Sequence, residues 1–315
     1  MAATVSIPVQ LQHDITNRVQ RGLLEQFDHT FAISDKALTR TDPGDVRQMS
    51  SAFRQLYLAL SDLKPFITHE SLLNFEISIR SIADALGEIC YQDTAILALQ
   101  EVAPQTPCEI TATIHQFIAT RKKIRRKSRQ ALERVLVSLG ENVHRAHFAN
   151  PLPLATRRIG VIRRRKPAGS FRNVADSIVE SHLAEFEKWS RLLKEPSPFV
   201  ELCAMDRATH RLKYAIDLFS DFWTSDVRMF STSLATLQRA LSKVSHYDAW
   251  IQELRKQIVQ SKKTHPHAAK RTLVFLFAEF SELRNNHLHE SFALWNAWES
   301  NQLSHKLRKT ITRSI

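Results

Sequence analysis

Glycine is scarce in this sequence, with 6 residues in a chain of 315. Turn-rich β architectures and glycine-rich phosphate-binding loops both depend on glycine, so the sequence disfavours both classes. Cysteine is also rare, and Cys90, Cys108 and Cys203 are scattered without paired spacing. This pattern argues against a disulfide framework and indicates a reducing compartment.

Long apolar runs are absent as well. No run approaches the roughly 18 residues that a membrane-spanning helix needs, and LVFLFAEF at 273–280 is typical of a core helix. The opening residues MAATVSIPVQ lack the basic start and the apolar core of a signal peptide. We therefore expect a cytoplasmic protein with no membrane span.

What the chain does contain is typical of a folded helical protein. Hydrophobic residues make up 43% and charged residues 24% of the sequence, and long stretches rich in Leu, Ala, Glu, Arg and Gln favour helix. The apolar periodicity predicts an all-α fold. The expected helices span roughly 14–32, 43–62, 69–101, 108–149, 171–194, 198–221, 227–260 and 266–302.

The two halves of the chain resemble each other. RQLYLALSDL (54–63) aligns with HRLKYAIDLF (210–219), and ALGEICYQDTA (85–95) aligns with ALSKVSHYDAW (240–250), which places Asp93 opposite Asp248. We predict a single domain over 1–315 with internal repeats at roughly 14–149 and 171–302, joined by a basic linker at 150–170. The repeats would form two helical bundles related by a pseudo-twofold axis.

The positive charge is concentrated in one segment. The chain has a formal net charge of +12 and a pI of about 9.8, a balance that attracts polyanions. Residues 121–172 contain 16 Lys or Arg and 2 acids, a net +14, whereas the remainder nets −2. On a helix, Arg121, Arg125 and Arg129 form one ridge, and Lys122 and Arg126 run beside it. Because such like charges repel, the ridge suggests a nearby anion.

A second basic surface is expected on RATHRLKYAIDLF (207–219). Helical spacing places Arg207, His210, Arg211, Lys213 and Tyr214 opposite an apolar stripe. That stripe consists of Met205, Ala208, Leu212, Ala215, Ile216 and Phe219. The basic side is either a binding surface or simply the solvated face of an ordinary helix.

Sequence motifs for catalysis are missing. The sequence contains no nucleophile elbow, no P-loop and no dinucleotide fingerprint, and we expect neither an enzyme nor a cofactor. His144 and His147 share a helical face, but no carboxylate or cysteine set completes a metal site there. Trp295 and Trp298 recur at helical spacing, which is more typical of a core than of a base-stacking platform.

The segment HRLKYAIDLF, followed by LSKVSHYDAW (241–250), resembles the second half of a CHAD domain, a helical domain named for its histidines. DVRQMSSAFRQLYLALSDL (45–63) and ALGEICYQDTA are similar to the first half. The resemblance implies two four-helix bundles around a basic cleft. It also implies binding of inorganic polyphosphate, with an association with polyphosphate granules.

The family pattern can be placed on this chain residue by residue. Its basic run falls on His210, Arg211 and Lys213, with Tyr214 next, and Arg54 matches a basic position of the first half. The two signature histidines fall on Arg47 and Cys203. The resemblance, together with the basic ridge, predicts these polyanion-binding residues: Arg47, Arg54, Arg121, Lys122, Arg125, Arg126, Arg129, Arg207, His210, Arg211, Lys213 and Tyr214.

Three interpretations remain open at this point. The first is a non-enzymatic polyphosphate-binding protein of the cytoplasm, associated with granules. The second is a general binder of polyanions or nucleic acid that uses 121–172. The third is a helical scaffold whose basic surface contacts a protein partner.

Overall fold

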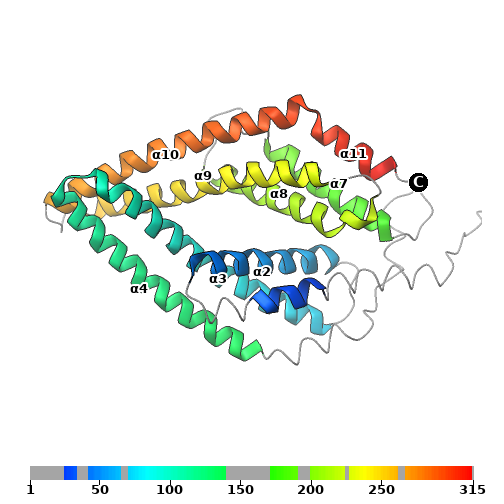
Figure 1. The fold of residues 1–315 in the computed structure, drawn as a ribbon, viewed down its shortest axis with the longest axis horizontal. Helices are drawn as coiled ribbons and strands as arrows, with labels where there is room; N and C mark the ends of the chain where they lie inside the picture. The colour runs from blue at the N-terminus through cyan, green and yellow to red at the C-terminus, as the bar shows by residue number, and fades with distance from the viewer. Residues whose placement is uncertain are drawn as a thin grey trace, which may run out of the picture. The chain divides into compact units, whose positions relative to one another are not determined.

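The structure is a computed structural model that describes residues 25–33, 42–64, 70–139, 171–190, 199–223, 227–261 and 267–313. Within these ranges the chain forms helices and no strands (Figure 1), so the predicted all-α class is confirmed. After a helical segment at 25–33 the elements are α2 (Pro43–Leu63), α3 (Glu70–Val102), η2 (Ala103–Gln105), α4 (Cys108–Leu139), α7 (Phe171–Ser190), α8 (Phe199–Leu218), η4 (Ser220–Phe222), α9 (Arg228–Ser261), α10 (His267–Ser300) and α11 (Leu303–Arg313).

The sequence placed most of these helices correctly. The boundaries of α2, α3, α9 and α10 agree with the predicted ranges to within about two residues. The predicted ranges 14–32, 108–149 and 171–194 extend beyond the described residues, and their described parts are helical. The basic linker 150–170 and the pair His144 and His147 lie outside the part of the chain that the structure describes.

The connection between α3 and α4 is fixed by proline and threonine. Pro104 lies in η2, and Pro107 directly precedes α4, at positions where proline's missing N–H leaves no hydrogen bond unmade. Between them Thr106 adopts an extended conformation and donates its hydroxyl to the carbonyl of Ala103 at 2.8 Å. These contacts reverse the chain, so that α4 can pack against α3.

The helix α11 was not expected from the sequence. It follows α10 after a break at Gln302, whose φ of 52° lies in the left-handed region. Trp298 Nε1 donates to Ser304 Oγ across the break at 2.9 Å. The apolar positions Leu303, Leu307 and Ile311 are buried, so α11 packs as an amphipathic helix.

The described chain divides into two compact units. Unit 1 contains the described residues of Met1–Cys90, Ser128–Ser181 and Tyr214–Thr224, and unit 2 contains those of Tyr91–Lys127, His182–Lys213 and Ser225–Ile315. Each unit therefore takes segments from both halves of the sequence. The proposed repeat of the two halves, and their pseudo-twofold relation, stay predictions.

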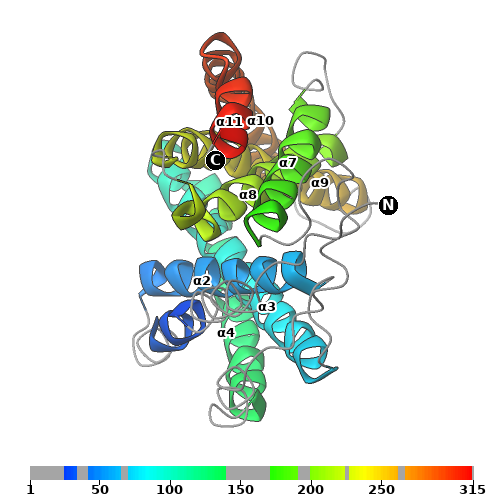
Figure 2. The ribbon, with the colours of Figure 1, turned by 90° about the vertical axis from the view of Figure 1, so that its right-hand side faces the viewer.

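The core of unit 1 centres on phenylalanine rings. Phe27 lies against Phe75 with ring centroids 5.7 Å apart, and Phe31 meets Phe53 edge-on at 5.6 Å. These contacts join the segment 25–33, drawn in dark blue beside α2 in Figure 2, to α2 and α3. Apolar ring burial of this kind stabilises helix packing.

Among the described residues of unit 2, apolar side chains form two clusters. One joins the end of α3, the start of α4, the end of α9 and the start of α10, around Leu99, Ile114, Trp250 and Leu276. In the other, Phe186 of α7 packs edge-on against Trp295 and Trp298 of α10, with centroids 5.3 and 5.5 Å away. Because both tryptophans are buried, their assignment to the core is confirmed.

Candidate functional site

The basic ridge of α4 faces carboxylates of the protein itself. Arg125 donates from Nε to Oδ1 of Asp93 on α3, and from Nη2 to Oδ2 at 3.3 Å. The side chains of Arg125 and Asp93 are 21% and 9% exposed. The anion that the spacing of the ridge suggested is therefore, at Arg125, an aspartate of the same chain.

Arg121 is held in the same way. Its Nη2 donates to Oε2 of Glu253 on α9 at 2.7 Å, and its Nη1 donates to Oε1 of Gln92 at 3.1 Å. The guanidinium also lies over the ring of Tyr91, 5.8 Å from the centroid, a cation–π geometry. Arg129 donates to Glu133 of its own helix at 3.4 Å.

The other basic side chains of α4, next to Arg121 and Arg125 in the sequence, are more exposed. Lys122, Lys123, Arg126 and Lys127 are exposed, and the structure shows no ion pair for them with any described residue. We call these residues the exposed α4 cations. All four carry the same charge, and the acids that contact α4 at Arg121 and Arg125 pair with those two arginines instead.

The face of α8 that the sequence singled out is partly neutralised. Its apolar stripe is buried as predicted, from Met205 to Phe219. On the other side Arg211 Nη1 donates to Glu185 of α7 at 3.3 Å, and His210 Nε2 lies 3.5 Å from Asp206. Asp206 also accepts a hydrogen bond from Ser242 at 2.9 Å.

The remaining predicted residues of α8 have different surroundings. Arg207 is exposed and Lys213 is half-buried. Tyr214 is buried, with its hydroxyl 3.5 Å from that of Ser51. It lines a pocket of unit 1 whose charged lining residues are Asp62 and Asp217, an acidic setting that does not favour an anion.

The predicted residues of α2 also belong to unit 1. Arg47 is exposed, and Arg54 is half-buried. A Cβ atom at Gly87 of α3 would lie 3.3 Å from Nη2 of Arg54, so the guanidinium passes over α3 where a side chain is lacking.

The predicted site is thus divided between the two units. Unit 1 contains Arg47, Arg54, Arg129 and Tyr214. Unit 2 contains Arg121, Lys122, Arg125, Arg126, Arg207, His210, Arg211 and Lys213. The single cleft that would combine all of them stays a prediction.

Sequence reasoning singled out Asp248 but missed its partner. Arg284 of α10 donates from Nε to Oδ1 of Asp248 at 3.1 Å. Burial raises the pKa of Asp248, and the attraction and hydrogen bond of Arg284 oppose that shift. The spacing in the sequence could have indicated Arg284. It follows Asp248 by 36 residues, and Arg125 follows the aligned Asp93 by a similar 32 residues.

The described residues contain no group of three or more His, Cys, Asp or Glu side chains that could hold a metal ion. His287 is 3.0 Å from Glu290 and stacks on Tyr247, so its contacts are with the protein. Cys203, at a signature histidine position, is half-buried, and burial raises the pKa of its thiol.

Comparison with known proteins identifies the family. A model of the CHAD domain matches residues 21–255. An all-helical chain with this match belongs to the CHAD domain family, as the resemblance in the sequence predicted. The comparison with curated proteins found no match.

Solved structures show the same fold. The crystal structure of the CHAD domain from the plant Ricinus communis is similar with a TM-score of 0.66 and 17% identity, over 90% of this chain and 92% of that one. PptA from Streptomyces chartreusis is similar with a TM-score of 0.63 and 12% identity, over 90% of this chain and 99% of that one. No helix in the described ranges is long and apolar enough to cross a membrane.

Proposed function

We propose that this chain binds inorganic polyphosphate without catalysing a reaction on it. The observation that supports this proposal best is the exposed α4 cations, four positively charged side chains on a helix whose less exposed arginines, Arg121 and Arg125, are already paired. A linear phosphate chain has no base edge to read, so it needs only spaced Lys and Arg donors along its path. Membership of the CHAD domain family supports the same ligand.

Within this proposal the other exposed cations offer further phosphate contacts, each on its own unit. Arg207 on α8 and Arg47 on α2 are both exposed, and guanidinium groups bind phosphate at any cellular pH. Arg121 and Arg125 already have carboxylate partners in Glu253 and Asp93, so we do not count them among the phosphate contacts. In a cell, such a protein would be found at polyphosphate granules.

The test is a competition experiment at about 150 mM salt, where weak charge-only contacts fade. Labelled polyphosphate bound to the protein is challenged with unlabelled polyphosphate or with duplex DNA. We expect polyphosphate to compete far better than DNA. Equal competition would establish a general polyanion binder instead. If the protein binds neither polyphosphate nor DNA, the interpretation that remains is a helical scaffold for a protein partner.

A charge-reversal pair locates the site. The variant K122E/K123E/R126E/K127E should lose most of its polyphosphate affinity. A matched control, K256E/K270E/K306E/K309E, changes the net charge equally at exposed lysines of α9, α10 and α11 in the same unit and should keep it. Equal losses in both variants would mean that overall charge, and not the exposed α4 cations, sets the affinity.

A further inference from the structure

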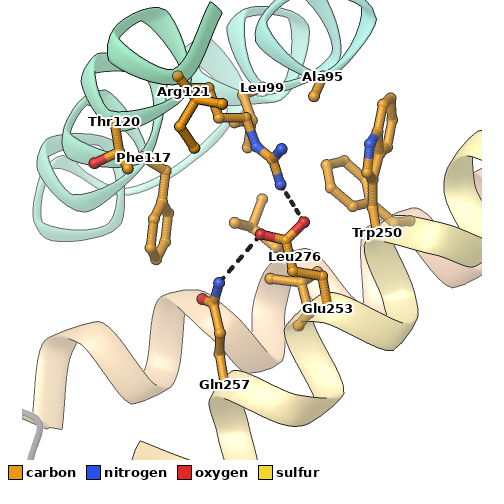
Figure 3. Close-up of a pocket in the computed structure, with 12 residues that line it drawn as sticks. Ala95, Leu99, Phe117, Thr120, Arg121, Trp250, Glu253, Gln257 and Leu276 are labelled. Atoms are coloured by element: carbon orange, nitrogen blue, oxygen red, sulfur yellow. Dashed lines mark hydrogen bonds and ion pairs between the residues drawn. The ribbon is translucent and has the colours of Figure 1, made fainter. Parts of the chain in front are cut away.

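Unit 2 contains a pocket that the proposed function does not use. It lies among four helices and has about 530 Å³ of empty space, part of it open to solvent. Figure 3 shows its walls, with Phe117 and Arg121 on α4 opposite Trp250, Glu253 and Gln257 on α9. We call it the α4–α9 pocket; its lining residues are Ala95, Leu99, Phe117, Thr120, Arg121, Ile124, Trp250, Glu253, Leu254, Gln257, Leu276 and Phe280.

The deep wall of the α4–α9 pocket is apolar and aromatic. Leu99, Trp250, Leu276 and Phe280 are all buried core residues, and the rings of Trp250 and Phe280 lie 5.3 Å apart. Such a wall favours a ring or a branched aliphatic group over water, because burial removes apolar surface from solvent.

One polar atom of this wall lacks a partner. Trp250 is 2% exposed, and its Nε1 is buried without a hydrogen-bond acceptor among the residues that the structure describes. A buried indole N–H normally finds an acceptor, and one that is left without costs stability. An occupant with an acceptor oxygen would remove that cost.

A carboxylate already lies at the charged side of the pocket. Glu253 accepts from Arg121 at 2.7 Å and from Gln257 at 3.4 Å (Figure 3). The side chain of Glu253 is 42% exposed, whereas that of Arg121 is 15% exposed. The glutamate can therefore move into water at little cost, while the arginine stays in place, held also by Gln92.

From these observations we propose that the α4–α9 pocket binds a small aromatic or branched aliphatic carboxylate. Its apolar group would lie against Trp250, Leu276 and Phe280. Its carboxylate would replace that of Glu253 on Arg121 and supply an acceptor for the N–H of Trp250. The pairing of Arg121 with a carboxylate beside an apolar wall of low dielectric constant provides the specificity for an acid over an uncharged ligand.

The test uses full-length protein and 4-fluorobenzoate as the probe, followed by ¹⁹F NMR, with 4-fluorobenzyl alcohol as the uncharged comparison. We expect saturable broadening with the acid and much weaker binding of the alcohol. In a ¹⁵N spectrum, the indole N–H signal that disappears in Trp250→Phe should shift with the acid, while the signals of the other tryptophans should not. Equal binding of the alcohol, or no shift at Trp250, would overturn the proposal.

Two variants at the mouth of the pocket sharpen the result. Thr120 is exposed and lines the pocket, whereas Ala119 is exposed and does not. Thr120→Trp should abolish saturable binding, and Ala119→Trp, the matched control, should keep it.

Glu253→Gln removes the competing carboxylate and should tighten binding of the acid by about two- to fivefold, the range of an exposed ion pair. Unchanged binding in both Thr120→Trp and Glu253→Gln would mean that the probe binds elsewhere. Polyphosphate binding should be the same with and without the acid, because the exposed α4 cations are not part of this pocket.

Discussion

Arg125 on α4 and Asp93 on α3 form a bidentate ion pair, in which Nε and Nη2 of the arginine donate to the two oxygens of the carboxylate. The aspartate aligned with Asp93 in the sequence, Asp248, is also paired with an arginine of the following helix, Arg284. The aligned aspartates thus serve the same purpose. Each holds two consecutive helices together and neutralises an arginine in the process.

Breaking the first of these pairs should destabilise the protein. Arg125→Gln leaves the carboxylate of Asp93 largely buried without its counter-ion, and we expect a loss of about 2–4 kcal/mol in the free energy of unfolding. Urea unfolding followed by circular dichroism measures the change. Arg80→Gln is the control, because Arg80 pairs with Asp84 on the surface of α3 and such a pair contributes less than about 1 kcal/mol. Equal losses in the two variants would contradict the structural role of Arg125.

The salt dependence of polyphosphate binding should report the exposed α4 cations. Each phosphate contact adds about 0.7 to the negative slope of log affinity against log salt for a single-stranded polyanion. The variant K122E/K123E/R126E/K127E should therefore have a slope about 3 units shallower than the unmodified protein. Filter binding at a series of salt concentrations measures it. An unchanged slope would place the phosphate contacts elsewhere.

Asp248 should make stability depend on pH in an unusual direction. Its pKa in the folded protein is raised, chiefly by burial, so the folded state holds this proton more tightly than the unfolded chain does. Its contribution is therefore fully present at low pH and is lost as the pH rises through the raised pKa. Compared with Asp248→Asn, which cannot ionise, the unmodified protein should lose stability as the pH rises from about 4, the ordinary pKa of an aspartate, through the raised pKa of Asp248.

Urea unfolding of both proteins across that range is the measurement for Asp248. The asparagine side chain in Asp248→Asn keeps an oxygen that can accept from Arg284, so the variant isolates the titration from the loss of the hydrogen bond. A difference that runs the other way would show that the charge of Arg284 outweighs burial.

The cysteines should differ in reactivity. Burial raises the pKa of the Cys203 thiol, which lowers its thiolate fraction, whereas Cys108 is exposed at the start of α4. With iodoacetamide near pH 8, Cys108 should be alkylated at least about tenfold faster than Cys203 in the folded protein. Peptide mass spectrometry gives both rates, and unfolding in urea should bring them together. Rapid labelling of Cys203 in the folded state would contradict the raised pKa of its half-buried thiol.

Much of the fold could be predicted because its signals are local. The apolar stripe from Met205 to Phe219 recurs at helical spacing, and every residue of it is buried. The break at Gln302 carried no such signal, since glutamine is not a usual residue for a left-handed φ. For that reason α11 was missed, although its own stripe of Leu303, Leu307 and Ile311 is regular.

The candidate site was predictable in composition but not in arrangement. The concentration of positive charge between 121 and 172, and the spacing of Arg121, Arg125 and Arg129 along one ridge, follow from the sequence alone. Which of these cations remain available does not, because their partners Asp93 and Glu253 lie 32 and 132 residues away. Charge and helical periodicity are properties of a short stretch of chain, whereas an ion pair depends on which helices pack together. The sequence by itself determined a basic, all-helical CHAD domain, and only the tertiary structure decided which side of α4 is neutralised and which side faces solvent.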